Sequence, residues 1–298
     1  MSAILCLGET LVDFICERPV ESVADADVFV PHFGGAAANV AVLTARAGAS
    51  VALASTVGDD PWGRWLRERL LAEGVDAELV VSAGQTAAAI VTVDDSGEPS
   101  FQIYGETLFE GETLFEGGAL GEAVPRAAAL YFSSNTLVGP SERDATMAAR
   151  DAALSADRPV IFDPNLRLSR WRSSAEAAAS VNACVPGALL VRCNEAEGTL
   201  MTGEYDPERA ALALLKAGAR LVVITRGPRG ALLRGEIRAD APGVAAAVRS
   251  TVGAGDSVTA ILLARLALAG WYPPAAAVAL RDAVTAGAEA CERWGAVD

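Results

Sequence analysis

Residues 251–257 read Thr-Val-Gly-Ala-Gly-Asp-Ser, and an apolar run follows them. Gly253 and Gly255 let the backbone turn tightly and come close to a ligand. We expect the N–H groups of residues 253–256 to point outward at the start of a helix, where backbone dipoles bind an anion. Asp256 makes sense there as a base, because a carboxylate beside a phosphate can take a proton from a hydroxyl. The alternative is an ordinary helix N-terminus with an acidic residue in its first turn.

The chain around this motif alternates strand-like and helix-like stretches over its 298 residues. Continuous apolar runs, typical of strands buried on both faces, occupy residues 3–7, 51–57, 129–132, 160–162, 189–191 and 221–225. Helix-like patterns occupy residues 37–47, 62–73, 141–154, 175–185, 207–217, 253–270 and 274–292, with a strand pair around 230–238. The alternation predicts an α/β fold, a mainly parallel sheet sandwiched by helices, with ligands at the carboxyl ends of the strands.

Two segments break this alternation. Residues 11–33 have no helical pattern and contain a strand-like stretch at 28–33. Residues 86–104 read as a hairpin around Asp-Asp-Ser-Gly at 94–97. We interpret the two segments, about 11–33 and 86–104, as a small β-sheet lid inserted in a single α/β domain that spans residues 1–298.

A tandem hexapeptide follows the hairpin. Residues 105–110 and 111–116 both read Gly-Glu-Thr-Leu-Phe-Glu. Two copies are too few to stack a core of their own. We expect either a duplication within a surface loop or an error in the sequence.

Composition excludes several classes of protein. The chain has 24 Lys and Arg against 38 Asp and Glu, a net charge of -14, whereas nucleic-acid binding needs a basic footprint. The single lysine, Lys216, lies in a helix-like stretch, so neither a Gly-x-x-x-x-Gly-Lys-Ser/Thr phosphate loop nor the strand lysine of protein kinases is present. Because His32 is the single histidine, a Ser-His-Asp triad or a histidine-based zinc site depends on one residue.

The sequence also predicts a cytoplasmic location. Its five cysteines form no Cys-x-x-Cys pair, and an odd, scattered set is typical of reduced thiols. Residues 1–7 lack the basic start of a signal peptide. The most apolar helix candidate, residues 260–270, carries Arg265 and is too short to span a bilayer. We expect no targeting segment and no membrane span.

Two further motifs suit a polar ligand. The string Phe-Gly-Gly-Ala-Ala-Ala-Asn at 33–39 opens a helix with small residues, and Asn39 offers both a donor and an acceptor; close helix–sheet packing is the alternative. Residues 163–171 follow a strand and read Asp-Pro-Asn-Leu-Arg-Leu-Ser-Arg-Trp. There Arg167 can clamp a phosphate or substrate oxygen, unless the segment is a surface salt-bridge loop.

Two more motifs suit a nucleotide. Asn194 and Glu197 follow a strand and share a face of a first helical turn, where they could hold a hydrated Mg²⁺; a capped helix is the alternative. Residues 225–230, Thr-Arg-Gly-Pro-Arg-Gly, form a glycine-rich turn after a strand. This turn could hold nucleotide phosphates, or it is a plain hairpin turn.

In this order the motifs resemble the ribokinase-like (PfkB) carbohydrate kinases, over residues 4 to about 296. The specific strings are 34–39, continued by Val-Gly-Asp-Asp-Pro-Trp-Gly at 57–63, and 253–256. Residues 163–171 look most like the fructokinase and 2-keto-3-deoxygluconate kinase branch. The resemblance implies a ribokinase-like fold and ATP- and Mg²⁺-dependent phosphorylation of a primary hydroxyl of a small sugar, either fructose-like or a keto-deoxy sugar acid.

The resemblance also implies residue roles. Asp256 is then the catalytic base, and the backbone of Gly253, Ala254 and Gly255 forms the anion hole, with Arg167 adding charge stabilisation. The residues implied for sugar binding are Asp13, Gly34, Gly35, Asn39, Asn135 and Asp256. The residues implied for ATP are Asn194, Glu197, Thr225, Gly227, Gly230 and Val284, with Glu197 acting on Mg²⁺ through water.

Two positions depart from the family pattern. Ser250 stands where many members have an aspartate, which leaves open whether a monovalent cation binds. Ala36 stands where ribokinases proper often have lysine, which disfavours ribose. Family members often pair through their lids, so we expect a homodimer, with sugar and ATP as ligands and no nucleic acid or membrane as a partner.

The sequence leaves three alternatives to a sugar kinase. A kinase of the same fold could act on a nucleoside or another alcohol, and a protein of the same fold could bind a sugar or nucleotide without catalysis. An NAD-dependent dehydrogenase is disfavoured, because Gly-Glu-Thr-Leu-Val at 8–12 replaces the Gly-x-Gly-x-x-Gly that should follow the first strand.

Overall fold

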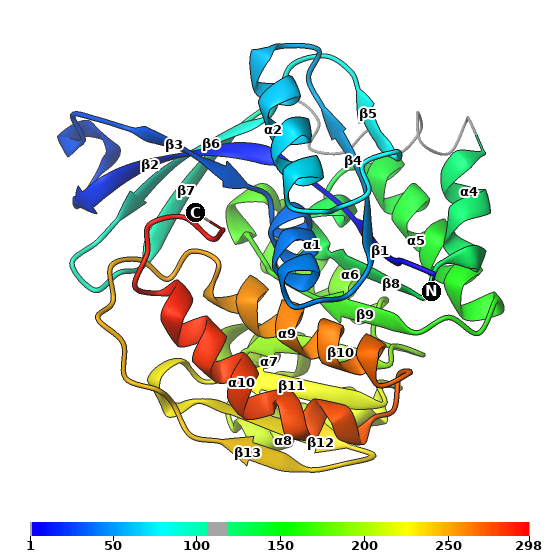
Figure 1. The fold of residues 1–298 in the computed structure, drawn as a ribbon. Helices are drawn as coiled ribbons and strands as arrows, with labels where there is room; N and C mark the ends of the chain where they lie inside the picture. The colour runs from blue at the N-terminus through cyan, green and yellow to red at the C-terminus, as the bar shows by residue number, and fades with distance from the viewer. Residues whose placement is uncertain (1, 106–117, 298) are drawn as a thin grey trace.

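The computed structural model describes residues 2–105 and 118–297, so most of the tandem hexapeptide lies outside the described residues. Over these ranges the main sheet has nine strands (Figure 1). In spatial order they are β13 (Ala239–Ala241), β12 (Ala231–Gly235), β11 (Leu221–Thr225), β10 (Leu190–Asn194), β9 (Val160–Asp163), β8 (Ala129–Ser133), β1 (Ile4–Leu7), β4 (Val51–Val57) and β5 (Val80–Ser82). From β11 to β5 all neighbouring strands pair in parallel, while β12 and β13 run antiparallel to their neighbours.

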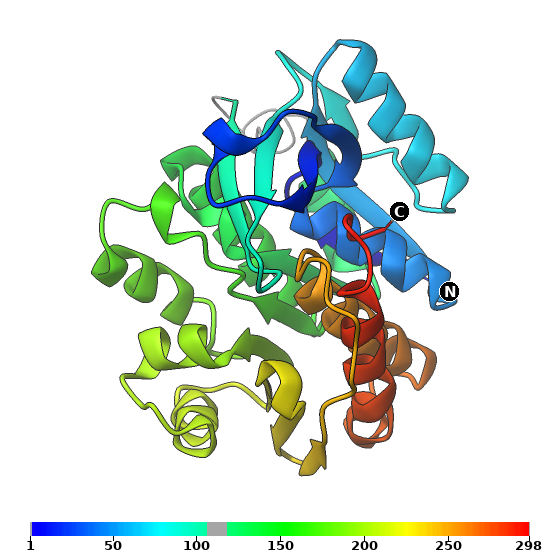
Figure 2. The same ribbon diagram turned by 90° about the vertical axis from the view of Figure 1, so that its left-hand side faces the viewer.

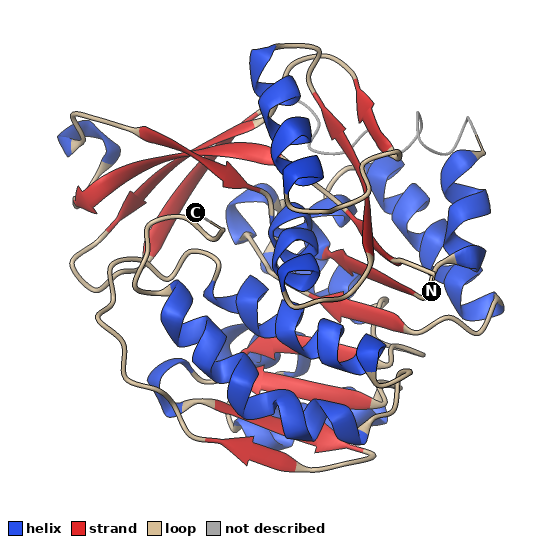
Figure 3. Ribbon diagram, in the orientation of Figure 1, coloured by secondary structure: helices blue, strands red, loops and turns tan. Residues whose placement is uncertain are grey.

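Helices cover both faces of this sheet, as Figure 3 shows. The helices that pack on one face are α1 (Ala36–Arg46), α2 (Pro61–Ala72), α9 (Ala254–Leu268) and α10 (Pro274–Ala290). The helices that pack on the other face are α4 (Ala119–Ala123), α5 (Pro140–Ser155), α6 (Ser174–Asn182), α7 (Glu195–Thr202) and α8 (Pro207–Lys216). Strand β1 shows why both faces must be covered: Ile4 and Cys6 enter one core, and Leu5 and Leu7 enter the other.

A second sheet, of four strands in the described part of the chain, stands beside the first and lies at the upper left of Figure 1. Its strands, in spatial order, are β3 (Val30–Gly34), β2 (Leu11–Pro19), β6 (Ala88–Val93) and β7 (Pro99–Tyr104). Figure 2 shows the sheet above the carboxyl ends of the main strands. In β7, Phe101 and Ile103 are half-buried while Gln102 and Tyr104 are exposed, so the strand turns one face toward the main sheet.

The expected α/β fold is confirmed, as is the hairpin within residues 86–104, whose strands β6 and β7 pair antiparallel. Two differences stand out. Residues 11–33 also contain the nine-residue strand β2 and a short 3₁₀ helix, Val23–Asp25, neither of which the sequence pattern singled out. Strand β10 continues beyond the expected 189–191, through Arg192 to Asn194, because a buried partner compensates the charge of Arg192, as described below.

Helix α9 connects the fold to the functional site, since its first turn carries the Gly-Ala-Gly-Asp motif and its body is packed into the core. Nine of its residues are buried, so the helix is apolar around much of its circumference. Within residues 2–105 and 118–297 no helix is long and apolar enough to cross a membrane.

Two leucines of α9 provide a test of this packing. Leu262 is 0% exposed and Leu268 is 52% exposed. We expect Leu262→Ala to lower the free energy of unfolding by about 2–5 kcal/mol, because it removes apolar contacts and leaves a cavity. Leu268→Ala should change it by less than about 0.5 kcal/mol. Urea denaturation of both variants measures the difference, and equal losses would contradict the placement of α9.

Candidate active site

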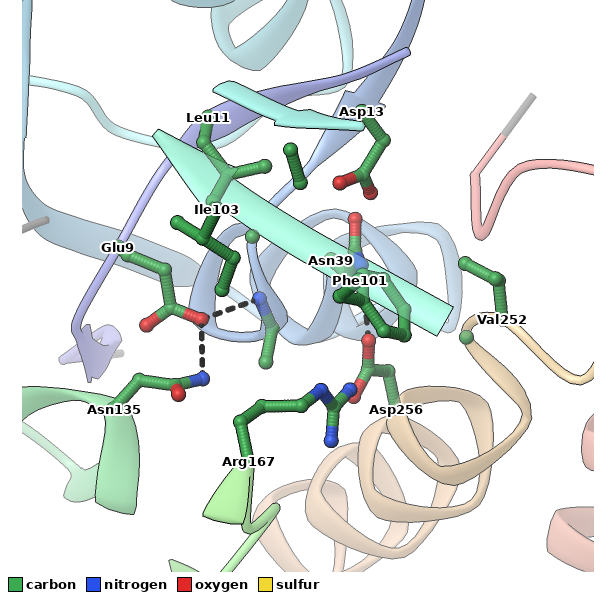
Figure 4. A pocket seen from close by; sticks show the side chains of 14 residues that line it. Glu9, Leu11, Asp13, Asn39, Phe101, Ile103, Asn135, Arg167, Val252 and Asp256 are labelled. Carbon is green, nitrogen blue, oxygen red and sulfur yellow. Dashed lines mark hydrogen bonds between the residues drawn. The ribbon is translucent and has the colours of Figure 1, made fainter. Parts of the chain in front are cut away.

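The motifs from distant parts of the sequence meet where the carboxyl ends of the main strands face the start of α9. Three neighbouring pockets lie there. The first contains Asp13, Asn39, Asn135, Arg167 and Asp256 and is closed from above by side chains of the second sheet (Figure 4). The second shares Arg167 and Asp256 with the first. The third shares Thr251 and Gly255 with the second, so the three form one continuous site.

Asp256 lies at the junction of the first two pockets, in the first turn of α9. Its carboxyl is buried and accepts hydrogen bonds from Asn39 Nδ2 at 2.9 Å and from Asn165 Nδ2 at 3.2 Å. Burial raises the pKa of Asp256 to about 7, and the hydrogen bond from Asn39 opposes this rise. A carboxyl group with such a pKa can take up and release a proton near neutral pH.

The turn that presents Asp256 differs in part from the expectation. Gly253 has φ 76°, the left-handed region that favours glycine, whereas Gly255 lies inside the helix with no such φ. The amide of Ala254 already donates to the carbonyl of Thr251 at 3.2 Å. Within the described residues, the amides of Gly253, Gly255 and Asp256 have no backbone acceptor, so they are the donors left for an anion at this end of the helix.

The expected sugar-binding residues Asp13, Gly34, Gly35 and Asn39 lie together. A Cβ atom added at Gly34 would lie 2.3 Å from Asp13 Oδ2, so the missing side chain makes room for this carboxyl. Burial raises the pKa of Asp13 to about 7, although the positive charge of Arg167 opposes the rise. Asn39 Oδ1 is buried and has no hydrogen-bond partner among the described residues, so it is free to accept one from a ligand.

Glu9 is a pocket residue that the sequence analysis missed. It follows β1 and is buried; its Oε1 accepts hydrogen bonds from the amide of Ala36 at 2.8 Å and from Asn135 Nδ2 at 2.9 Å. Its Oε2 has no partner among the described residues. Burial raises the pKa of Glu9, and the charge of Arg170 opposes this. Its position after a buried strand was the same signal that drew attention to residues 163–167.

Arg167 links the second sheet to the site. Its guanidinium carbon lies 4.7 Å from the ring centroid of Phe101 on β7, a cation–π distance. The side chain lines both the first and the second pocket. The wall that the second sheet adds to the first pocket includes Ala89, Phe101 and Ile103, which carry no charge.

The residues expected at the nucleotide fall into two groups. Thr225, Gly227, Gly230 and Val284 all line the third pocket, a largely apolar cleft of about 510 Å³. Asn194 and Glu197 line the second pocket, of about 730 Å³. The structure therefore places all six in the two pockets that residues of the Gly-Ala-Gly-Asp motif also line.

Asn194 and Glu197 form the capping box that was the alternative interpretation of this motif. Asn194 Oδ1 accepts from the amide of Glu197, and Glu197 Oε2 accepts from the amide of Asn194, both at 2.8 Å. Glu197 Oε1 also accepts from the amide of Leu166 at 2.8 Å. In the ranges that the structure describes, no group of three His, Cys, Asp or Glu side chains could hold a metal ion. Mg²⁺ usually keeps several waters and binds through one or two carboxylates together with substrate phosphates.

An apolar cleft next to free amides at a helix start, with a buried carboxyl facing a polar pocket, is the arrangement expected of a small-molecule kinase of the α/β class. The chain belongs to the pfkB family of carbohydrate kinases, whose model matches residues 1–298. It is a fructokinase-like, ATP-dependent sugar kinase, and the family assignment made from the sequence is confirmed.

Individual relatives agree with this assignment. Fructokinase-2 of Oryza sativa subsp. japonica is 31% identical over 268 residues, which cover 89% of this chain and 80% of the relative. The structure of a fructokinase from Vibrio cholerae O395 with fructose, ADP and calcium ion has a TM-score of 0.85 and 29% identity, covering 100% of this chain and 95% of its own. The aminoimidazole riboside kinase of Salmonella enterica, complexed with aminoimidazole riboside and an ATP analog, has a TM-score of 0.82 and 25% identity over 99% of this chain and 95% of its own.

The carboxyl of Asp256 provides a test of the site's electrostatics. We expect it to titrate near pH 7, with Asn39→Ala shifting the midpoint upward by about one unit, because a hydrogen bond to the charged form is lost. Carbon-detected NMR of protein labelled at aspartate carboxyl carbons measures this, with Asp256→Asn assigning the signal. A midpoint near the usual value for aspartate would contradict the buried geometry.

Proposed function

We propose that this protein transfers the terminal phosphoryl group of ATP to a primary hydroxyl of a small neutral sugar of the fructose type, with Asp256 as the general base. The observation that carries the proposal is the position of Asp256. Its buried carboxyl lines both the polar first pocket and the larger second pocket. The fructokinase relatives support the substrate class.

The mechanism follows from the geometry. Phosphoryl transfer passes through a loose transition state, so positioning and charge stabilisation account for most of the rate. Asp256 accepts the proton of the sugar hydroxyl, while Asn39 and Asn165 hold its two oxygens in place. The free amides of Gly255 and Asp256 and the charge of Arg167 stabilise the negative charge on the group in transfer.

Mg²⁺ would come with ATP and neutralise charge on its phosphates. We assign Glu197 to the Mg²⁺ side of the second pocket through water, because both its oxygens already accept backbone amides. Asn194 then shapes the cleft by capping α7. We assign the apolar third pocket, with Thr225, Gly227, Gly230 and Val284, to the adenosine part of ATP.

The lining of the first pocket favours a neutral sugar over a keto-deoxy sugar acid. Glu9 and Asp13 face the space together with Asp256, and Arg167 is the basic residue in the described lining. Two buried oxygens without partners among the described residues, Glu9 Oε2 and Asn39 Oδ1, suit hydroxyl donors. A carboxylate ligand would instead face like charges in a region of low dielectric.

The proposal also covers the role of the second sheet, the oligomeric state and the cellular location of the enzyme. We assign the second sheet the role of a lid over the sugar, which would keep water from the phosphoryl group, and we propose that two copies pair through these lids. All five cysteines are unpaired, which supports a reducing compartment such as the cytoplasm.

A nucleoside acceptor is the second candidate. The likeness to a riboside kinase with a TM-score of 0.82 favours it, since a nucleoside also offers a primary hydroxyl. The base and the anion site would serve both acceptors unchanged, so the choice depends on the first pocket alone.

Asp256→Asn tests the base directly. We expect kcat to fall by roughly 10²- to 10⁴-fold, the usual range for a lost general base, while the isosteric side chain leaves ATP affinity and the unfolding midpoint close to those of the parent. Turnover in a coupled ADP-release assay and ATP binding by calorimetry measure the two effects. Near-normal turnover would exclude Asp256 as the base.

A substrate panel tests the acceptor. The same assay with Mg-ATP should give saturable turnover with fructose and at least tenfold lower kcat/KM with 2-keto-3-deoxygluconate, while ribose, glucose, adenosine and inosine complete the panel. Preference for the acid would contradict the charge argument, and turnover with nucleosides alone would select the second candidate.

The pH dependence of the reaction tests the base independently. Because the base must be deprotonated, kcat/KM should decline as the pH falls below about 7, following the raised pKa of Asp256.

A further inference from the structure

Arg192 is a buried cation in the middle of the sheet that no motif accounts for. It lies on β10, is 7% exposed, and follows the apolar residues Leu190 and Val191. Its Nη1 lies 3.3 Å from Asp163 Oδ2, and its Nη2 donates to Thr225 Oγ1 at 2.8 Å. Its Nε has no hydrogen-bond partner among the described residues. A buried arginine with an unused donor is expensive unless something else compensates it.

The guanidinium lies where the second and third pockets meet. Arg192 lines both of them, and within the described lining of the third pocket it is the basic residue. A Cβ atom added at Gly255 would lie 2.6 Å from Nη1 of Arg192. The cation is therefore in contact with the backbone whose free amides face the anion site.

The neighbourhood keeps Arg192 charged and fixed. Burial lowers its pKa, but the carboxylates of Asp163, Glu197 and Asp256 raise it more, so that the pKa lies above its usual value. Asp163 is fixed in turn, since its Oδ2 accepts from Thr259 Oγ1 at 2.8 Å and its Oδ1 from the amide of Asn165 at 3.1 Å. Acidic side chains thus outnumber the one guanidinium group in this neighbourhood. The phosphates of a bound nucleotide would need the positive charge of Arg192 to offset the repulsion from these carboxylates.

We propose that Arg192 binds the terminal phosphates of ATP and stabilises the charge on the phosphoryl group during its transfer. The proposal rests on the kinase function argued above and adds a second cation to Arg167, which lines the same second pocket. It also explains why position 255 is glycine, because any side chain there would displace the guanidinium from the anion site.

The test compares nucleotides of increasing phosphate number. Affinities for AMP, ADP and a non-hydrolysable ATP analogue are measured by calorimetry with Mg²⁺ and without sugar. Arg192→Met should weaken ADP and the ATP analogue by roughly 10- to 100-fold, the range for a charge-assisted hydrogen bond, and change AMP by less than about threefold. Arg192→Lys, which keeps the charge, should restore much of the difference, and kcat should fall about 100-fold in the methionine variant.

Arg234 offers a matched control. It is also a buried arginine of the main sheet, on β12, paired with Glu208 and Asp240, and it lines none of the three pockets. Arg234→Met should lower stability and leave the ratio of ADP to AMP affinity unchanged. Should Arg192→Met fail to fold, Arg192→Gln keeps hydrogen-bond donors toward Asp163 and Thr225 without the charge and serves the same comparison.

The outcomes separate the two proposals. Equal losses for AMP, ADP and the analogue, or no loss, would show that Arg192 acts through the packing of the sheet and would overturn this inference. A selective loss for ADP and the analogue supports it. No sugar is present in this binding experiment, so its result does not depend on the sugar assignment. If Arg192→Met selectively weakens ADP and the analogue while the parent protein phosphorylates no compound of the panel, the proposed function alone is contradicted.

Discussion

The hydrogen bond from Asn39 to Asp256 joins residues 217 positions apart and holds together the starts of α1 and α9. Asn165 binds the second oxygen of the same carboxyl and adds the segment that follows β9. These three segments come from the three parts of the chain that carry the family's motifs. The rest of the site depends on this convergence, since the amides of the α9 turn and the sugar pocket are placed relative to Asp256.

Burying that carboxyl is costly, and the fold compensates it locally. The chain carries a net charge of -14, so its overall field does not favour an anionic ligand such as ATP. Two guanidinium groups nevertheless line the site, those of Arg167 under β7 and Arg192 beneath Gly255. A third, that of Arg170, lies behind it and donates to the carbonyl of Asn135. Arg192 is buried, and Arg167 and Arg170 are half-buried, so each of these charges has a stronger effect than a fully exposed charge would have in water.

Sequence reasoning could predict the α/β alternation, the hairpin of the second sheet and the grouping of the motif residues, because strand ends and glycine-rich turns leave periodic and compositional signals. It missed Glu9 and Arg192, although both are charged residues at or near the ends of apolar strands. A charged residue there is equally consistent with the end of the strand, and one sequence does not show that Asp163 and Thr225 lie beside Arg192. Strand β2 was missed because polar and apolar residues do not alternate along it: Asp13 is buried among apolar neighbours, and the last three residues are all exposed.

The two glycines of the Gly-Ala-Gly-Asp motif turn out to serve different physical purposes. Gly253 is required by its backbone, at φ 76°, and by Ala296, whose Cβ would lie 2.4 Å from an added side chain. Gly255 has no such backbone constraint; a Cβ atom there would lie 2.6 Å from Nη1 of Arg192, so the guanidinium would have to shift. The sequence assigns both glycines to one turn, whereas the structure divides them between a turn and a contact across the sheet. Arg192 on β10 thus restricts which residue can occupy position 255 at the start of α9, and both β10 and α9 contribute to the anion site.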